Sequence, residues 1–203
     1  ATVLLPDYSS VNGKIYVGHP DSTGQTGPGL TGYGINKTWD HNFSGNVWAY
    51  GGDYILIRYP EVLLSYLECK IESGATISQD LLDKTINQLR GREEVNIGNV
   101  SETDPIKLKE IVKNERGIEL AMEGGIRYLD LIRWKEGVQK LNRKFYGMKI
   151  TDNPGSYTGK YVLDSEGNIF IQERMFKEHN YLWPIPQSEL DINNNLKQNP
   201  GYN

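Results

Sequence analysis

The chain has little cysteine, no long apolar run and no excess of positive charge. Cys69 is the one cysteine among 203 residues, so no disulfide can form within the chain. Because it lies between Leu67 and Ile71, we expect Cys69 to be a small buried apolar side chain. No run of about 18 consecutive apolar residues exists, so no membrane-spanning helix is predicted. The 22 basic residues are outnumbered by 26 acidic ones, which argues against a nucleic-acid partner.

Motifs for metals and cofactors are also missing. The three histidines, His19, His41 and His179, are far apart and show no spacing typical of zinc ligands. Residues 164–168 carry oxygen-bearing side chains, but they lack the twelve-residue pattern of a calcium-binding loop. We therefore predict no metal and no cofactor, and we interpret 164–168 as a turn.

The first quarter of the chain differs in composition from the rest. Residues 1–52 are rich in glycine, serine, threonine, asparagine and aromatic residues, which predicts a segment dominated by loops. A short strand is predicted over 54–58, and Pro60 suits the first turn of a following helix. That helix, from about Pro60 to Ile71, is apolar nearly all round its circumference, so we expect it to be buried on most sides.

Three further helices are predicted. One covers 78–90, where Ser78 can cap its start, and it forms an antiparallel pair with the preceding helix. The next covers 104–123, because an Asp-Pro pair opens it and two glycines end it. The last begins near Ile126 and includes Trp134.

The expected architecture is mainly α with one small β-hairpin. Two consecutive helical hairpins are similar to tetratricopeptide units, although the alanine and glycine positions of that repeat do not fit both pairs. Further along, residues 160–163 and 168–172 flank a turn that contains Gly167, which predicts two antiparallel strands.

Two carboxylates are predicted to face the core on the helix over 104–123. On a helical wheel, Glu115 and Glu119 fall within one apolar arc, whose other members are Leu108, Ile111, Val112, Ile118 and Met122. A buried carboxylate needs a cationic partner, so we predict structural ion pairs that include Arg127 and Arg133. The other candidate cations are Arg58, Arg90 and Arg116. A glycosidase would also use two carboxylates, but these usually line a cleft from different elements.

Aromatic and polar residues alternate in the loop-rich segment. A sugar ring stacks on a flat aromatic side chain while short polar groups bond its hydroxyls, so we predict ligand binding by Trp39, Asp40, Asn42, Trp48 and Tyr50. The alternative is that Trp39 merely holds the loop against the helices. Two other tryptophans, Trp134 and Trp183, are expected in the core.

Three segments, 53–68, 114–134 and 181–189, resemble the carboxy-terminal part of the SusD/RagB family. They occur in the family's order, and the closing residues 198–202 extend the match. The resemblance implies a SusD-like, mainly α fold with helical hairpins similar to tetratricopeptide units, long ordered loops and a small β-hairpin. Residues 1–203 are then one carboxy-terminal region, made of a loop-rich segment (1–52), helical hairpins (53–142), and a hairpin with a terminal loop (143–203).

The resemblance also implies a function without catalysis. Members of the family bind glycans or other nutrients at the cell surface of Bacteroidota as outer-membrane lipoproteins, and deliver them to a SusC-like TonB-dependent transporter. A signal peptide and a lipidated cysteine are implied for the precursor but are not seen here, so we expect a missing amino-terminal helical region. The alternatives are a glycoside hydrolase and a helical protein-interaction scaffold.

Overall fold

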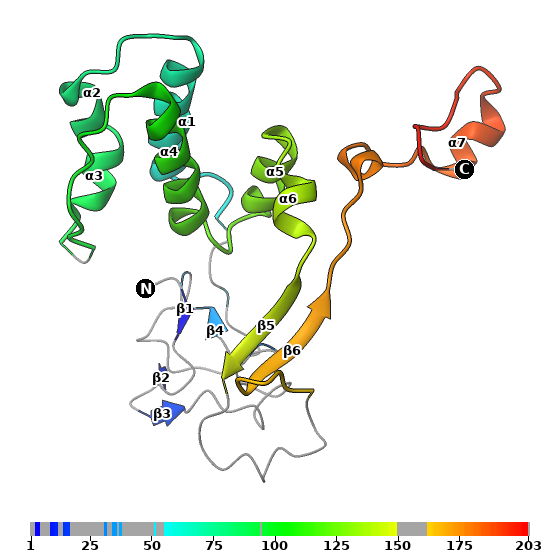
Figure 1. Cartoon of the computed structure of the whole chain (residues 1–203), viewed down its shortest axis with the longest axis horizontal. Helices are drawn as coiled ribbons and strands as arrows, with labels where there is room; N and C mark the ends of the chain where they lie inside the picture. Colours follow the sequence, from blue (N-terminus) through cyan, green and yellow to red (C-terminus); the bar gives the residue numbers. More distant parts are fainter. Residues whose placement is uncertain are drawn as a thin grey trace. The chain divides into compact units, whose positions relative to one another are not determined.

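A computed structural model describes the helices and strands of the chain. The described residues are 3–4, 9–11, 14–16, 31, 34–35, 37, 51, 55–93, 95–149 and 162–202. The chain divides into two compact units, and the boundary between them falls in the first turn of α5 (Ile126–Arg133). Helices α1 to α4 belong to one unit, and the later elements together with four short strands belong to the other (Figure 1). The predicted mainly α fold with a small antiparallel sheet is confirmed.

Helix α1 (Tyr59–Glu72) begins where the sequence predicts it. Pro60 lies in its first turn, where a missing N–H costs nothing, and Gly74 ends it with a φ of 69°. The strand predicted over 54–58 is wrong for its described part, because residues 55–58 have no strand hydrogen bonds. Arg58 in this segment instead has extended backbone and precedes the helix.

The helix predicted over 78–90 is two shorter helices, α2 (Gln79–Asp83) and α3 (Ile86–Arg90). Ser78 caps α2 as predicted, since its hydroxyl accepts a hydrogen bond from the Leu81 N–H at 3.2 Å. The helix breaks at Thr85, whose backbone departs from helical angles and whose hydroxyl donates to the Leu81 carbonyl at 2.6 Å. Such side-chain bonds compete with the helical ones.

Helix α4 (Pro105–Glu119) starts at the predicted Asp-Pro pair. The Asp104 side chain accepts hydrogen bonds from the N–H groups of Ile106 and Lys107 at 3.1 and 3.0 Å. The helix ends at Glu119, before the two glycines predicted to stop it, and Met122 then has a left-handed backbone with a φ of 63°. Met122 therefore leaves the apolar arc and is exposed.

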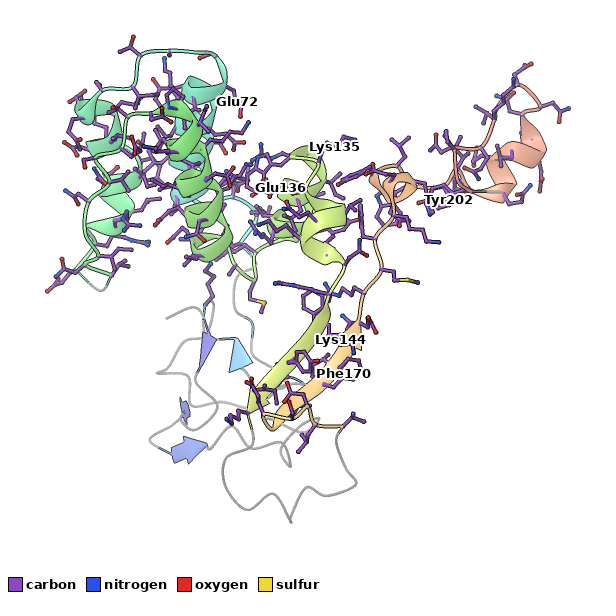
Figure 2. The ribbon with its side chains drawn as sticks, viewed as in Figure 1. Glu72, Lys135, Glu136, Lys144, Phe170 and Tyr202 are labelled. Atoms are coloured by element: carbon purple, nitrogen blue, oxygen red, sulfur yellow. The ribbon has the colours of Figure 1, made fainter. Side chains whose placement is uncertain are left out.

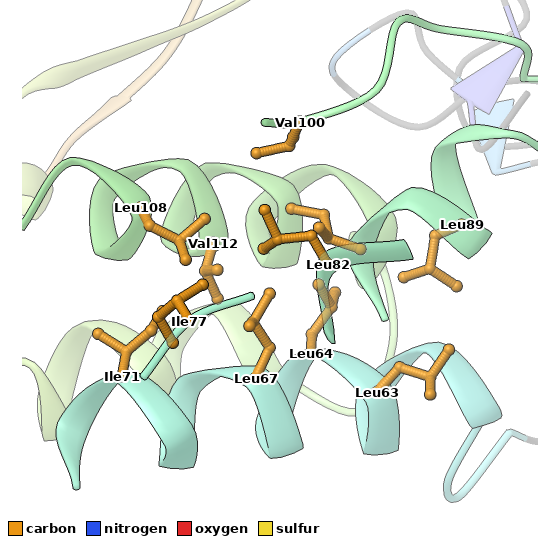
Figure 3. Packing of buried hydrophobic residues seen from close by; sticks show 11 residues of the cluster. Leu63, Leu64, Leu67, Ile71, Ile77, Leu82, Leu89, Val100, Leu108 and Val112 are labelled. Carbon is orange, nitrogen blue, oxygen red and sulfur yellow. The ribbon is translucent and has the colours of Figure 1, made fainter. Parts of the chain in front are cut away.

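One apolar core joins α1 to α4. Helix α1 packs against α3 and α4, and Figure 3 shows the contributing side chains pointing toward one another from facing helices. The core consists of Leu63, Leu64, Leu67, Ile71, Ile77, Leu82, Ile86, Leu89, Val100, Leu108 and Val112. These buried leucine, isoleucine and valine side chains supply the main favourable free energy of folding in this unit.

A buried asparagine fixes the loop that follows α3. The Asn87 side chain donates to the Val100 carbonyl at 2.9 Å and accepts from the Val100 N–H at 2.7 Å. It also donates to Asp83 at 2.8 Å, so both ends of its amide are satisfied although the residue is only 5% exposed. The Asn87 amide thus bonds both backbone groups of Val100, as a paired strand would, and keeps Val100 against the core.

Part of α1 is not buried, which corrects the prediction that it is covered on most sides. Tyr59, Val62 and Tyr66 are exposed by 61%, 52% and 50% and follow one another at helical spacing. Cys69, one turn further along, is exposed as well, so the prediction of a buried thiol is wrong. We refer to these four residues as the open face of α1.

The second unit contains helices and a β-hairpin. Helix α5 ends one residue before Trp134, which lies in a turn and is partly buried, and α6 (Gly137–Leu141) follows. Strand β5 (Lys144–Lys149) pairs antiparallel with β6 (Asn168–Glu173). Figure 2 labels Lys144 and Phe170 on these two strands.

The predicted hairpin is present in its described part, because the Phe170 N–H donates to the Val162 carbonyl at 2.8 Å and the Asp164 N–H donates to the Asn168 carbonyl at 3.0 Å. Leu163 adds an antiparallel bridge to Ile169, and β6 also pairs along its length with β5, a second partner that was not predicted. The predicted turn is present, because Asp164 accepts hydrogen bonds from the N–H groups of Glu166 and Asn168 at 2.9 Å each. Alternation of apolar residues identifies a strand but not which neighbour it pairs with.

The carboxy-terminal segment contains short helices and connecting turns. It comprises a 3-10 turn, η4 (Glu178–Tyr181), and helix α7 (Gln187–Ile192). Trp183 between them is 77% exposed, so the prediction of a core residue is wrong. The Gln198 amide binds both the N–H and the carbonyl of Ile185 at 2.8 Å, which fixes the loop against the segment before α7.

Short strands lie in the part of the chain predicted to be loops. Strand β1 (Val3–Leu4) pairs antiparallel with β4 (Gly34–Ile35), and β2 (Ser9–Val11) pairs antiparallel with β3 (Lys14–Tyr16).

Candidate functional site

The predicted ligand-binding residues lie outside the described part of the chain. These are Trp39, Asp40, Asn42, Trp48 and Tyr50. Their role stays a prediction. The predicted ion-pair residues, by contrast, lie on α4 and α5, and their surroundings can be described atom by atom.

Arg58 connects the start of α1 to the end of α4. Its Nε and Nη2 atoms donate to Glu123 Oε1 at 2.9 and 2.6 Å. The same Nη2 donates to Glu119 Oε1 at 3.0 Å and to the Glu119 carbonyl at 2.9 Å. The hydrogen bond to Glu123, followed by that to Glu119, raises the pKa of Arg58 although burial lowers it. One guanidinium thus binds two carboxylates and a helix-end carbonyl.

Two more arginines complete the pairing of the predicted carboxylates. Arg92 donates from Nη2 to Glu119 Oε2 at 2.5 Å and from Nη1 to Oε1 at 3.2 Å, which is the bidentate arrangement of a guanidinium and a carboxylate. Arg90 donates from Nη1 to Glu115 Oε2 at 2.6 Å. The two α4 carboxylates therefore bind arginines from other elements. Arg58 precedes α1, Arg90 lies in α3, and Arg92 follows α3.

Arg127 and Arg133 make further contacts on α4 and α5. Arg127 donates to the Lys113 carbonyl at 3.4 Å, and its guanidinium lies against Gly117, whose Cβ position would be 3.0 Å from Nη1. Arg133 pairs with Asp130 on its own helix, with a distance of 2.9 Å between Nε and Oδ1. Arg127 thus connects the start of α5 to α4, whereas the ion pair of Arg133 lies within α5.

A further buried pair joins α1 to α4. Arg116 and Glu68 are both almost fully buried and lie 3.9 Å apart from Nε to Oε2. Arg116 also donates from Nη1 to the Ser65 hydroxyl at 2.9 Å. A guanidinium at this depth requires such partners, because burial of an unpaired charge is costly.

Sequence reasoning missed several members of this network. Glu123, Arg92 and Glu68 are not among the predicted residues, although Glu123 follows Glu119 at a spacing of four residues. Glu68 and Arg116 each lie on the inner face of a helix among leucines, which is a signal that a helical wheel can provide. Arg92 lies in a loop, where no periodicity indicates the direction of its side chain.

The network is suited to holding helices together and not to hydrolysis. Both oxygens of Glu119 accept hydrogen bonds from guanidinium groups, and Glu115 is buried against Arg90. A general acid must reach the substrate, whereas these carboxylates are bound by guanidinium groups. Within the described ranges, no group of three or more histidine, cysteine or acidic residues is placed to hold a metal ion. Nor does any described helix combine the length and the apolar character needed to cross a membrane.

Comparison with solved structures places this architecture among known proteins. A SusD-like carbohydrate binding protein from Bacteroides fragilis is 38% identical, with a TM-score of 0.83 over 97% of this chain and 40% of its own. A second SusD-like protein from the same species is 28% identical, with a TM-score of 0.66 over 86% of this chain and 31% of its own. A SusD superfamily protein from Parabacteroides distasonis is 25% identical, with a TM-score of 0.54 over 91% of this chain and 36% of its own.

The chain thus spans less than half the length of each of these solved relatives. No curated protein matches the sequence significantly. The family model described as the SusD family matches residues 6–202, which is nearly the whole chain. Together with the shared fold and the identity of 38%, this match shows that the chain belongs to the SusD family.

Proposed function

We propose that this chain is part of a protein that binds a glycan at the cell surface without hydrolysing it. The observation that carries the proposal is the similarity over 97% of the chain to a solved protein described as a SusD-like carbohydrate binding protein. The pairing of Glu115 and Glu119 with arginines supports a role without catalysis, since neither carboxylate is available as a general acid.

The proposed ligand contacts are those predicted from the sequence. Trp39, Trp48 and Tyr50 would stack on sugar rings, while Asp40 and Asn42 would bond the hydroxyls. Each stacking residue should contribute roughly 1 to 3 kcal/mol to binding, by analogy with base stacking on aromatic side chains.

We propose that the whole protein is an outer-membrane lipoprotein that delivers its ligand to a SusC-like TonB-dependent transporter. The family membership supports this proposal. A missing amino-terminal helical region would cover the open face of α1. Two observations support that region: the solved relative is much longer than this chain, and three large apolar side chains on α1 are at least half exposed.

A binding screen with soluble polysaccharides tests the central proposal. Isothermal titration calorimetry should detect at least one ligand for the chain, and an assay for new reducing ends should stay negative with that ligand. Alanine at Trp39, Trp48 or Tyr50 should weaken binding, whereas the matched control Trp183→Ala removes an exposed tryptophan outside the predicted site and should not. Release of reducing sugar would favour the hydrolase instead. A chain that binds no glycan but captures a protein would favour the interaction scaffold.

A further inference from the structure

Two arginines lie side by side on the β5–β6 hairpin. The pairing of Lys144 with Glu173 continues by one residue, because the Arg174 N–H donates to the Arg143 carbonyl at 3.2 Å. Arg143 and Arg174 are therefore opposite each other across the two strands. Because side chains alternate between the faces of a strand pair, both point to the face opposite to Lys144 and Glu173.

An aromatic ring lies beneath both guanidinium groups. Phe145 pairs with Gln172 on the same face, next to the two arginines. The central carbon of the Arg143 guanidinium is 4.8 Å from the centre of the Phe145 ring, and that of Arg174 is 4.4 Å away. Such cation–π contacts restrict long side chains that would otherwise sample many rotamers. The ring thus holds two positive charges in place on an ordered hairpin.

No described carboxylate neutralises these two charges. Neither guanidinium forms an ion pair with a carboxylate among the residues that the structure describes, and both arginines are exposed. The Gln172 amide, oriented with its oxygen toward Arg174, accepts from Nε and Nη2 at 2.6 Å each. Like charges directly opposite each other destabilise a strand pair. An anion between or above these arginines would remove that repulsion.

We propose that Arg143 and Arg174 form a subsite for the carboxylate or sulfate groups of an acidic glycan. This inference rests on the proposed function in glycan binding and names the chemistry of the ligand. A guanidinium presents two parallel N–H groups that match the oxygens of a carboxylate or a sulfate, and such charge-assisted bonds are about twice as strong as neutral ones. Phe145 adds an apolar surface on which a sugar ring can rest, so charge and ring recognition lie on one face of the hairpin.

The test compares acidic polysaccharides with their neutral counterparts on the full chain. Polygalacturonate is paired with its methyl ester to probe carboxylates, and dextran sulfate is paired with dextran to probe sulfates. Calorimetric titration should show that the acidic member of at least one pair binds roughly tenfold or more tightly than its neutral partner. One hydrogen bond to a charged group is enough to lower Kd by about that factor. The pair that shows the preference identifies the anionic group. A higher salt concentration should weaken this preference, because the site is exposed.

Charge-matched variants separate a specific subsite from general attraction. R143Q/R174Q should lose most of the preference, whereas K140Q/K197Q removes two exposed charges elsewhere and should retain it. Equal losses in the two double variants would overturn the subsite. R143K/R174K keeps the charge without the guanidinium geometry, so full affinity in that variant would overturn bidentate recognition. Far-UV circular dichroism checks that every variant remains folded.

The outcomes also distinguish this inference from the function on which it rests. Tight binding of neutral glycans with no preference for the acidic member of either pair would overturn the subsite and leave the proposed function intact. Absence of binding to every polysaccharide, acidic or neutral, would overturn both. Acidic preference that depends on Arg143 and Arg174 would support both.

Discussion

Removal of the Arg58 guanidinium should destabilise the helical unit more than removal of any surface charge. Arg58→Met keeps an unbranched apolar side chain but deletes the donors to Glu123, Glu119 and the Glu119 carbonyl. The Glu123 side chain is only 3% exposed and that of Glu119 13% exposed, so both carboxylates would lose a cation in a poorly hydrated place. Breaking such a buried pair typically costs about 3 to 5 kcal/mol.

The expected loss is at the lower end of that range. The Arg58 side chain is 24% exposed, so water screens part of its interaction, and Arg92 remains to pair with Glu119. We therefore expect Arg58→Met to lower the free energy of unfolding by about 3 kcal/mol. For a chain of 203 residues this corresponds to a decrease in Tm of roughly 6 to 12 °C.

Arg92→Met is the matched control for this experiment. Its side chain is 40% exposed and, among the described carboxylates, it pairs with Glu119 alone, so its loss should lower the free energy of unfolding by about 1 kcal/mol or less. Thermal and urea unfolding monitored by far-UV circular dichroism would measure both variants. The coupling energy of the Arg58–Glu123 pair follows from R58M/E123Q compared with the single variants R58M and E123Q. An Arg58→Met chain that unfolds at the same temperature as Arg92→Met would refute the reasoning.

Three further predictions concern other parts of the chain. Gly137→Ala should lower stability by about 1 to 3 kcal/mol, because a Cβ there would lie 2.7 Å from the Phe176 ring, while Gly98→Ala, with open space around it, should have little effect in the same melts. Asn87→Ala should lower the free energy of unfolding by about 2 to 4 kcal/mol and speed hydrogen exchange in the following loop, since the N–H and carbonyl of Val100 lose their partner. Unchanged exchange rates would contradict this prediction. Hydrogen bonds, first that from the Asn168 side-chain amide, hold the pKa of Asp164 below its usual range. The turn should therefore be intact above the pKa that Asp164 has in the unfolded chain, and it should open as the pH falls through the pKa in the folded chain. An NMR titration that places the folded pKa at or above the usual value would contradict this prediction.

Local signals in the sequence predict the starts of helices well. Asp104 and Ser78 cap helices where expected, because an N-cap depends on a few adjacent residues. The break at Thr85 could not be predicted, since a helix and a pair of shorter helices have the same apolar stripe. The pairing of β6 with β5 could not be predicted either, because alternation within a strand does not show which distant segment pairs with it.

Burial was harder to predict than secondary structure. Val62 and Tyr66 are apolar residues on a helix whose other sides are buried, so the sequence indicates a core position for them. A helical wheel gives the directions of side chains but not what lies opposite them. The same limit applies to Trp183, whose apolar neighbours suggest a core that the described residues do not form around it.

Among the site residues, those that form ion pairs were easier to predict than those that bind a ligand. Glu115 and Glu119 pair with arginines because buried carboxylates have few alternatives, although the partners are Arg90, Arg58 and Arg92. Ligand contacts depend on the surface that a loop presents, which composition alone does not determine.

Because Cys69 is exposed, its thiol can report whether another segment covers α1. It is the single thiol in the sequence, and it lies on the open face of α1 next to Tyr66 at helical spacing. A maleimide dye or a spin label would therefore attach at one defined position without any engineered cysteine. The rate at which the thiol reacts, or the mobility of an attached label, would follow directly whether another helical segment covers α1 in a longer form of the protein.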